Sequence, residues 1–247
     1  ITIILAFLMT LSSPVAAQDY DKGLAALQAD AQYNLGNMYY MGQGGPQDYA
    51  EAMKWWRLAA DQGVADAQYK LGKMYRNGEG VPQDYAEAVK WFRLAADQGD
   101  ARIQSMLGNM YHRGDGALQD YKEAVKWYRL AADQGVADAQ YNLGNMYSFG
   151  QGGPQDYAEA VKWWRLAADQ GVADAQSDLG VMYSNGQGVL QDNAVAHMWY
   201  NIGAANGSEI GGKLRDMLAK KMTPAAIEKA QAMARECMSS NYKKCGY

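Results

Sequence analysis

Residues 64–99 of this 247-residue chain read VADAQYKLGKMYRNGEGVPQDYAEAVKWFRLAADQG, and this stretch decides the fold. Its Leu-Gly-x-Met-Tyr core recurs every 36 residues, at Leu35, Leu71, Leu107, Leu143 and Leu179. A fixed period of this length is typical of repeat proteins, in which one structural unit is copied and each copy packs on the next. Such an array offers a long surface and seldom a single pocket. The sequence therefore favours a binding scaffold and does not identify its partner.

One unit is predicted to contain two helices separated by a turn. Apolar residues at helical spacing indicate a first helix over residues 65–76, which the Gly- and Pro-containing residues 77–82 end. Asp84 and Glu87 have the spacing of a capping box at the start of a second helix, and Gly99 is the expected left-handed residue after it. The residues expected to be buried are Ala67, Leu71, Met74, Tyr75, Ala88, Trp91, Phe92, Ala95 and Ala96.

The glycine of the repeated motif indicates close helix packing. Gly72 has a counterpart in every copy, although a glycine inside a helix costs about 1 kcal/mol relative to alanine. We expect a neighbouring helix to approach it, with Trp91 filling the volume between layers. The whole pattern predicts an all-α solenoid with five helix pairs over residues 31–207, a short N-terminal capping helix within 18–30 and C-terminal capping helices over 208–247. Thr223-Pro224 is a start signal for the last of these helices.

The N-terminal residues predict export. Residues 1–15 are almost wholly apolar and uncharged, and the small residues 15–17 suit signal peptidase. Residues 1–17 are therefore interpreted as a signal peptide truncated at its start, and the mature protein as beginning near Gln18. A buried N-terminal helix or an uncleaved anchor is the alternative. We expect a periplasmic or secreted protein without an integral membrane span after cleavage.

The two cysteines, Cys237 and Cys245, are eight residues apart at the C-terminus. An exported compartment permits disulfides, so a terminal disulfide is the favoured interpretation. Metal binding is the weaker alternative, because no histidine or further cysteine lies near enough in sequence to complete a tetrahedral set.

Charge argues against nucleic acid as a partner. The net charge is −4, although residues 208–247 hold eight basic against four acidic residues, so the repeats themselves are acidic. Nucleic-acid binding depends on neutralising phosphates, which an acidic array does not do. The basic end is interpreted as an ordinary solvated face.

The repeated unit resembles the Sel-one-like repeat, a relative of the tetratricopeptide repeat. The matching residues are Ala67, Leu71, Gly72, Tyr75, Gly78, Gly80, Asp84, Ala88, Trp91, Ala95, Ala96 and Gly99. The resemblance implies a right-handed superhelix of helix pairs that serves as an adaptor, and a secreted bacterial member of the family. A cysteine-rich branch of that family, linked to β-lactam binding, has cysteines eight apart in its repeats. Here only Cys237 and Cys245 show that spacing.

Catalytic and cofactor motifs are not found. The G-x-G pairs of the loops lack the preceding strand and the Lys-Ser/Thr of a phosphate loop, so they are interpreted as turns. The sequence has no H-E-x-x-H or G-x-S-x-G motif, and its two histidines are 85 residues apart. We expect no enzymatic activity, no cofactor and no metal.

Recognition is predicted on the first helices, opposite their core stripe. Residues there differ between copies, and the third copy departs most from the template. Tyrosine, arginine and asparagine combine contact area with hydrogen bonding, which suits reversible peptide contacts. The hypothetical partner-binding residues are Tyr69, Lys73, Arg76, Asn109, His112 and Tyr141.

The predicted function is an exported scaffold that binds a peptide or protein segment in the concave groove of the solenoid. The chain is expected to be a monomer or to self-associate weakly. Two alternatives remain at this point: a cell-wall-related enzyme that interacts with β-lactams, and a structural, self-assembling spacer.

Overall fold

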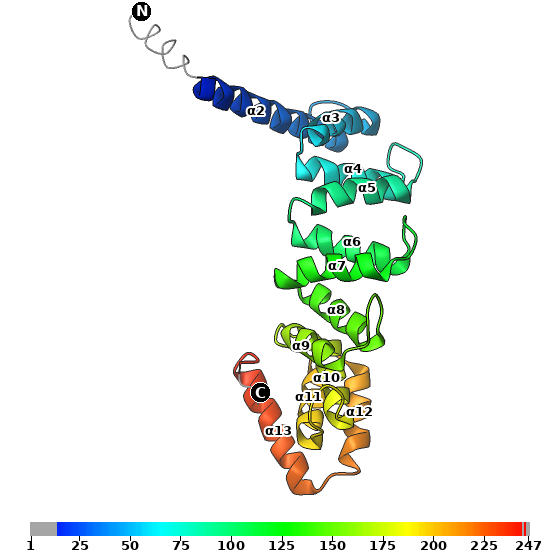
Figure 1. The fold of residues 1–247 in the computed structure, drawn as a ribbon, viewed down its shortest axis with the longest axis vertical. Helices are drawn as coiled ribbons and strands as arrows, with labels where there is room; N and C mark the ends of the chain where they lie inside the picture. Colours follow the sequence, from blue (N-terminus) through cyan, green and yellow to red (C-terminus); the bar gives the residue numbers. More distant parts are fainter. Residues whose placement is uncertain (1–13, 244, 246–247) are drawn as a thin grey trace, which may run out of the picture. The chain divides into compact units, whose positions relative to one another are not determined.

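The computed structural model describes residues 14–243 and residue 245, and all regular structure in this part of the chain is helical (Figure 1). The chain divides into two compact units, residues 1–99 and residues 100–247. The first unit contains helices α2 (Pro14–Met41), α3 (Tyr49–Asp61), α4 (Ala65–Asn77) and α5 (Tyr85–Ala96). The second contains α6 (Ala101–Arg113), α7 (Tyr121–Asp133), α8 (Ala137–Phe149), α9 (Tyr157–Ala168), α10 (Ala173–Asn185), α11 (Asn193–Ala205), α12 (Glu209–Ala219) and α13 (Pro224–Ser239). The predicted all-α, helix-pair fold is confirmed.

Each helix pair is closed by the same local contacts. Asp84 caps the N-terminus of α5, and its carboxylate accepts a hydrogen bond from the Glu87 backbone N–H at 3.0 Å. The Asp84 N–H donates to the carbonyl of Tyr75 at 2.8 Å, so it is not available for the second bond of a capping box. Glu87 instead pairs with Lys90. The cap predicted from sequence is therefore present, while the reciprocal bond from the Glu87 side chain is replaced by a contact that closes the hairpin.

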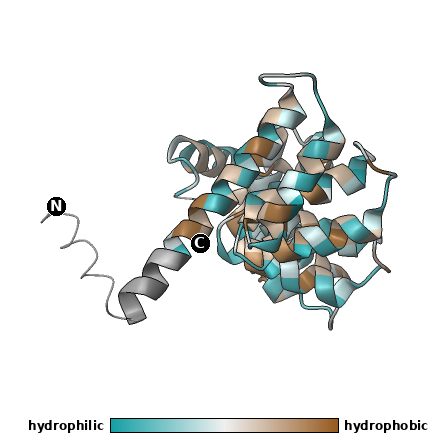
Figure 2. Ribbon diagram, turned by 90° about the horizontal axis from the view of Figure 1, so that it is seen from above, coloured by the Kyte–Doolittle hydropathy of each residue, from teal (hydrophilic) through white to brown (hydrophobic). Residues whose placement is uncertain are grey.

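The repeated glycine lies against an aromatic ring of the second helix in its own repeat. A β-carbon built on Gly72 would lie 2.6 Å from the ring of Phe92. The equivalent glycines meet the equivalent rings in the same way, at Gly36–Trp56, Gly108–Tyr128, Gly144–Trp164 and Gly180–Tyr200. Trp91 packs with buried residues of α3 and α4, as expected for a residue between layers. The close approach thus involves the residue after the repeated tryptophan. Figure 2 shows the hydrophobic residues mainly along the helices, and mostly hydrophilic loops.

Glutamine side chains connect consecutive helices on one edge of each unit, and we call this set the glutamine ladder. Gln68 donates to the carbonyl of Ala60 at 3.1 Å, and Gln98 donates to Gln68 Oε1 at 2.9 Å. In the second unit Gln140 donates to the carbonyl of Ala132 at 3.1 Å, and Gln170 donates to Gln140 Oε1 at 2.8 Å. The bonds from Gln68 and Gln140 give a carbonyl at a helix C-terminus a hydrogen-bond partner in addition to the N–H of the glycine after the helix. The further members are Gln62–Gln32, Gln134–Gln104, Gln176–Ala168 and Asn206–Gln176.

At the C-terminal end a disulfide holds the last residue of the ladder. Cys237 and Cys245 form the predicted bond, with Cα atoms 4.5 Å apart. In the loop that they close, the Tyr242 hydroxyl accepts a hydrogen bond from Asn206 Nδ2 at 2.8 Å. Asn206 has the ladder position that glutamine occupies in the earlier repeats. The disulfide loop therefore provides a cap for the ladder.

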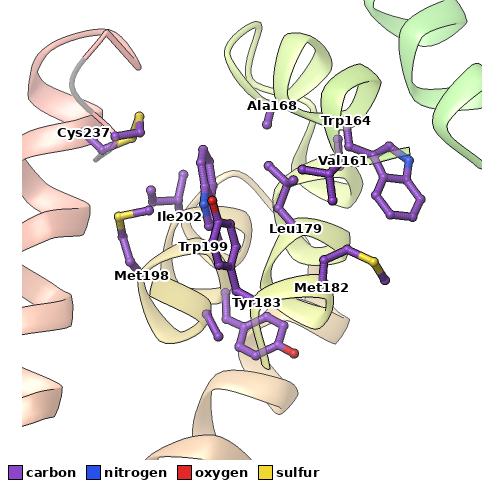
Figure 3. Close-up of a cluster of buried hydrophobic side chains, with 14 of the residues drawn as sticks. Val161, Trp164, Ala168, Leu179, Met182, Tyr183, Met198, Trp199, Ile202 and Cys237 are labelled. Atoms are coloured by element: carbon purple, nitrogen blue, oxygen red, sulfur yellow. A yellow bond between two sulfur atoms is a disulfide. The ribbon is translucent and has the colours of Figure 1, made fainter. Parts of the chain in front are cut away.

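Helix α13 packs on α11 because the outer side of α11 is apolar. Met198 and Ile202 are fully buried there, and Figure 3 shows them on the side of α11 where Cys237 of α13 lies. Four earlier repeats have a lysine in place of Met198 and a 41–48% exposed leucine in place of Ile202. Helix α13 begins at Thr223-Pro224 as predicted, with the Thr223 hydroxyl accepting from the Ala226 N–H.

At the N-terminal end a single helix replaces two expected ones. Helix α2 runs unbroken through the predicted N-terminal capping segment and the first helix of the first repeat. Residues 1–13 of the predicted signal peptide, residues 1–17, lie outside the described part of the chain. The signal peptide therefore stays a prediction. None of the helices in the described part has both the length and the apolar character that a membrane span requires.

Candidate functional site

In the first unit, polar and aromatic side chains gather where α2 and α3 meet α4 and the loop after it. The Tyr40 hydroxyl donates to Glu79 Oε2 at 2.8 Å, and Lys70 Nζ lies 5.7 Å from the ring centre of Trp56 and 5.9 Å from that of Tyr40. The bond to Glu79 is the main cause that raises the pKa of Tyr40. The pKa of Glu79 is lowered, mainly by its bond from Asn77 and then by the bond from Tyr40. A cation, an anion and two aromatic rings thus adjoin one another at this position.

Three of the predicted binding residues belong to this unit, on α4. The Tyr69 ring packs at 5.7 Å from the ring of Phe92, and the Arg76 guanidinium lies 5.8 Å from the same ring. The positive charge of Lys73 contributes to the lowered pKa of Glu79. The structure therefore groups Tyr69 and Arg76 around Phe92.

The second unit has a crevice of about 200 Å³ between its first two helix pairs. His112 forms one wall, with its ring 5.5 Å from that of Tyr121 and 6.5 Å from that of Tyr128. His112 Nε2 is within hydrogen-bond distance of Gln151 Oε1, at 3.3 Å. The lining residues, which we call the His112 crevice, are His112, Tyr128, Asn142, Asn145, Met146, Phe149 and Gln151.

The other predicted residues of this unit support the crevice from behind. Asn109 accepts a hydrogen bond from the Tyr128 hydroxyl at 2.8 Å, and it thereby fixes the ring that lines the crevice. Asn145 accepts from Trp164 Nε1 at 3.1 Å and also interacts with the Tyr141 hydroxyl. The structure thus links Asn109 and His112 through Tyr128, and it links Tyr141 to the opposite wall through Asn145.

Tyr141 connects the crevice with a half-buried carboxyl, that of Asp178 on α10. Burial raises the pKa of Asp178 to about 6, although a hydrogen bond from Tyr141 opposes this shift. Burial also raises the pKa of Tyr141 to about 12, and Asp178 adds to that rise.

Two positions at the candidate sites were missed in the sequence, because they lie in loops that were interpreted only as turns. Glu79 and Gln151 stand between the two loop glycines, and each reaches a first-helix residue 39 positions earlier, Tyr40 and His112 respectively. A signal for them was present. The residue between the glycines changes from copy to copy, as Gln43, Glu79, Asp115, Gln151 and Gln187.

A second crevice in this unit lies between α10, α11 and α12. Its volume is about 370 Å³, and its lining residues are Ser184, Tyr200, Leu214, Met217, Leu218, Lys220 and Lys221. Tyr200 and Ser184 stand 72 residues after Tyr128 and His112, so the two crevices occupy equivalent places in the repeat. The second unit therefore offers two hollows of different chemistry.

Among the described residues, no cluster of three or more His, Cys, Asp or Glu side chains has a geometry that could hold a metal ion. The groups gathered at the His112 crevice are amides, an imidazole, aromatic rings and a thioether. They are suited to contact another molecule by packing and hydrogen bonding.

Comparisons with known proteins agree with this architecture. The family model described as Sel1 repeat matches residues 29–64, 65–100, 102–136, 137–172 and 173–208. The chain is 39% identical to a protective antigen of uropathogenic Escherichia coli with an SLR fold, over 94% of this chain and 49% of that one, with a TM-score of 0.69. It is 31% identical to a Sel1 repeat protein from Oxalobacter formigenes, over 93% and 92% of the two chains, with a TM-score of 0.68. The chain thus spans about half the length of the E. coli antigen. None of the curated proteins matches it significantly.

Proposed function

Because the chain belongs to the Sel1 repeat family, whose members generally mediate protein–protein interactions, we propose that it is an exported scaffold that binds a peptide or protein segment on the groove side of its first helices. The observation that carries the proposal is the His112 crevice. It combines an apolar floor with amide and imidazole groups that face solvent. Sel1 repeat scaffolds are typically not enzymes, and we propose the same of this chain.

The chemistry of the crevice indicates the kind of segment that it would bind. Phe149 is 71% exposed at the rim, and Met146 lies at the floor, so an apolar side chain of the partner would be removed from water between them. Asn142 and Gln151 carry amides, which both donate to and accept from a peptide main chain. The proposed partner is therefore an extended segment with one apolar anchor residue.

The six predicted residues divide their roles within this proposal. In the second unit His112 contacts the partner, and Asn109 and Tyr141 position the walls of the crevice. In the first unit Tyr69, Lys73 and Arg76 offer an aromatic and cationic surface on α4. This surface suits an acidic stretch of a partner.

The experiment is a selection from a displayed library of random peptides against the purified full chain, followed by titration of synthetic peptides. We expect selected peptides to share an apolar residue and to lose about tenfold in affinity, or about 1.4 kcal/mol, in the Phe149→Ala and His112→Ala variants. Leu118→Ala is the matched control, because Leu118 is a 93% exposed apolar residue in the loop of the third repeat. Equal binding by all variants would contradict the proposed site, and a selection without enrichment would contradict the function.

Export has a separate test. The full chain is expressed with its N-terminal residues in a Gram-negative host, and the cell fractions are examined. We expect the product in the periplasm or medium with Gln18 as its first residue. A product that stays in the cytoplasm with an uncleaved N-terminus would refute this part of the proposal.

A further inference from the structure

The N-terminal half of the first unit exposes a helix face that later repeats bury. In the second repeat Ala67 and Leu71 are 0% exposed and Met74 is 1% exposed, because the second helix of the first repeat, α3, packs on α4. Their counterparts in the first repeat are Ala31, Leu35 and Met38. Ala31 is exposed, Leu35 is half-buried, and Met38 is 43% exposed. The face that receives a helix in the second repeat is therefore open in the first.

The open face of the first repeat corresponds to the face of the second repeat on which α3 packs. A β-carbon on Gly80 would lie 2.6 Å from Tyr49 Cβ, because the start of α3 is pressed against that loop. A β-carbon on the equivalent Gly44 would meet only the end of Met38, at 3.9 Å. A pocket of about 260 Å³ lies beside Gly44. The wall that α2 contributes to this pocket consists of Leu35, Met38 and Tyr39 and is mainly apolar. The geometry is that of a helix-binding slot.

A preceding repeat with the usual connection does not fill this slot. In the repeats a second helix is joined to the next first helix by a short turn, such as residues 62–64 between α3 and α4. Helix α2 instead continues toward its N-terminus without such a turn, from Met41 back to Pro14. The occupant must reach the slot by another route.

The apolar face of α2 is complementary to itself. Leu24 and Leu27, which are 55% and 69% exposed, extend the open face beyond the repeat. The apolar positions on this face are Leu24, Leu27, Ala31, Leu35 and Met38, and their spacing of 3, 4, 4 and 3 residues reads the same in both directions. All five lie on one side of a helix at this spacing.

We propose that two copies of the chain pair through α2 in an antiparallel, two-fold arrangement centred on Ala31. Leu24 of each copy then meets Met38 of the other, Leu27 meets Leu35, and the two Ala31 residues lie at the axis, where their small size permits close approach. An antiparallel partner helix has the same direction in the slot as α3 has against α4. Such an interface uses one patch on both copies and is therefore closed at two chains.

The test measures the mass of the full chain by sedimentation equilibrium over a concentration series. We expect a rise from one chain mass to two and no further. The Leu24→Lys/Leu27→Lys variant should remain at one chain mass with unchanged helicity, because both leucines lie outside the repeat core. Leu118→Lys/Leu190→Lys, which changes two leucines exposed by more than 90%, is the matched control and should dimerise like the original.

A cysteine at the axis gives an independent readout. Cys237 and Cys245 are bonded to each other and no other cysteine exists, so an Ala31→Cys variant carries one free thiol. We expect oxidation to link two copies through this thiol, whereas a Leu118→Cys variant should link far less. The proposal is overturned if the mass of the original chain stays at one chain. That result is expected if the occupant of the slot is a different protein or residues 1–13 of the same chain. The proposal is also overturned by a mass that grows beyond two chains, or by dimers that survive Leu24→Lys/Leu27→Lys.

Discussion

At the scale of single residues, the fold depends on a contact between a glycine and an aromatic ring. Sequence periodicity predicted that Gly72 marks close packing, and the structure identifies Phe92 as the group that it contacts. Periodicity could not identify the ring, because Trp91 and Phe92 are both at apolar positions of α5. Which of the two rings lies against Gly72 depends on the relative rotation of the two helices.

The first prediction concerns this glycine. Gly72→Ala should lower the free energy of unfolding by about 1–3 kcal/mol, because the added methyl group overlaps the Phe92 ring. Gly23→Ala is the control, since a β-carbon there meets nothing within 4 Å, and it should stabilise α2 by about 0.5–1 kcal/mol. Urea denaturation followed by far-UV circular dichroism measures both. A neutral or stabilising Gly72→Ala would disprove the packing argument.

The second prediction concerns Asp178. Its pKa is about 6 in the folded chain, mainly through burial, against an ordinary value of 3.8. The folded state therefore binds more protons than the unfolded state between pH 4 and pH 6, and stability should fall as the pH rises through this window. The total effect is at most about 3 kcal/mol.

Asp178→Asn should remove this part of the pH dependence and be more stable than the original chain at pH 7. Thermal melts between pH 4 and pH 7 measure the difference. Asp115→Asn, at an exposed loop position, serves as the control. An Asp178→Asn variant that keeps the full pH slope would show that another group is responsible.

The candidate site could be predicted only in part at this scale. Variation between copies indicated His112, Asn109 and Tyr141, and the structure relates the first two through Tyr128. Variation between copies did not indicate that Tyr128 lines a crevice, because Tyr128 is an aromatic residue at a core position of α7 and is almost wholly buried. Glu79 and Gln151 were missed because a loop residue between two glycines has no periodicity that shows what it contacts.

At the scale of helices, turn signals and caps located most boundaries, and the exception is the N-terminal end. Helix α2 is continuous because residues 18–30 contain no proline and no residue pair that forces a turn. The sequence contained one indication of where α13 packs: Met198 of α11 stands where four earlier repeats have lysine. The repeat pattern alone, however, does not predict a helix on this side of α11. The glutamine ladder was not anticipated, since buried glutamines at regular spacing resemble surface residues in a sequence.

The third prediction tests the ladder. Gln140→Ala should destabilise the chain by about 1–3 kcal/mol, because the Ala132 carbonyl and the Gln170 amide both lose a buried hydrogen-bond partner. Gln231→Ala, at an exposed position of α13, should change stability by less than about 0.5 kcal/mol. Chemical denaturation distinguishes the two. Similar small effects from both variants would mean that the ladder contributes little.

At the scale of the whole molecule, the C-terminal disulfide closes the last of the stacked helix pairs. The fourth prediction is that reduction lowers the free energy of unfolding by about 2–3 kcal/mol, as loop-closure entropy implies for a loop of this length. Tyr242 then loses its fixed place beside Asn206. Denaturation with and without a reducing agent measures the loss, and a Cys237→Ala/Cys245→Ala variant should be insensitive to the agent. If the original chain is equally insensitive, the cap is unimportant.

The constant 36-residue period of the glutamine ladder has a consequence for deletions of whole repeats. Residues 45–52 recur unchanged as residues 153–160, a shift of 153 − 45 = 108 residues, or three periods of 36. Unequal crossing-over between the two stretches would delete residues 45–152 and join the first helix of one copy to the second helix of another, with a glutamine or asparagine still available at each junction. A synthetic gene with this deletion should therefore still encode a cooperatively melting helical protein.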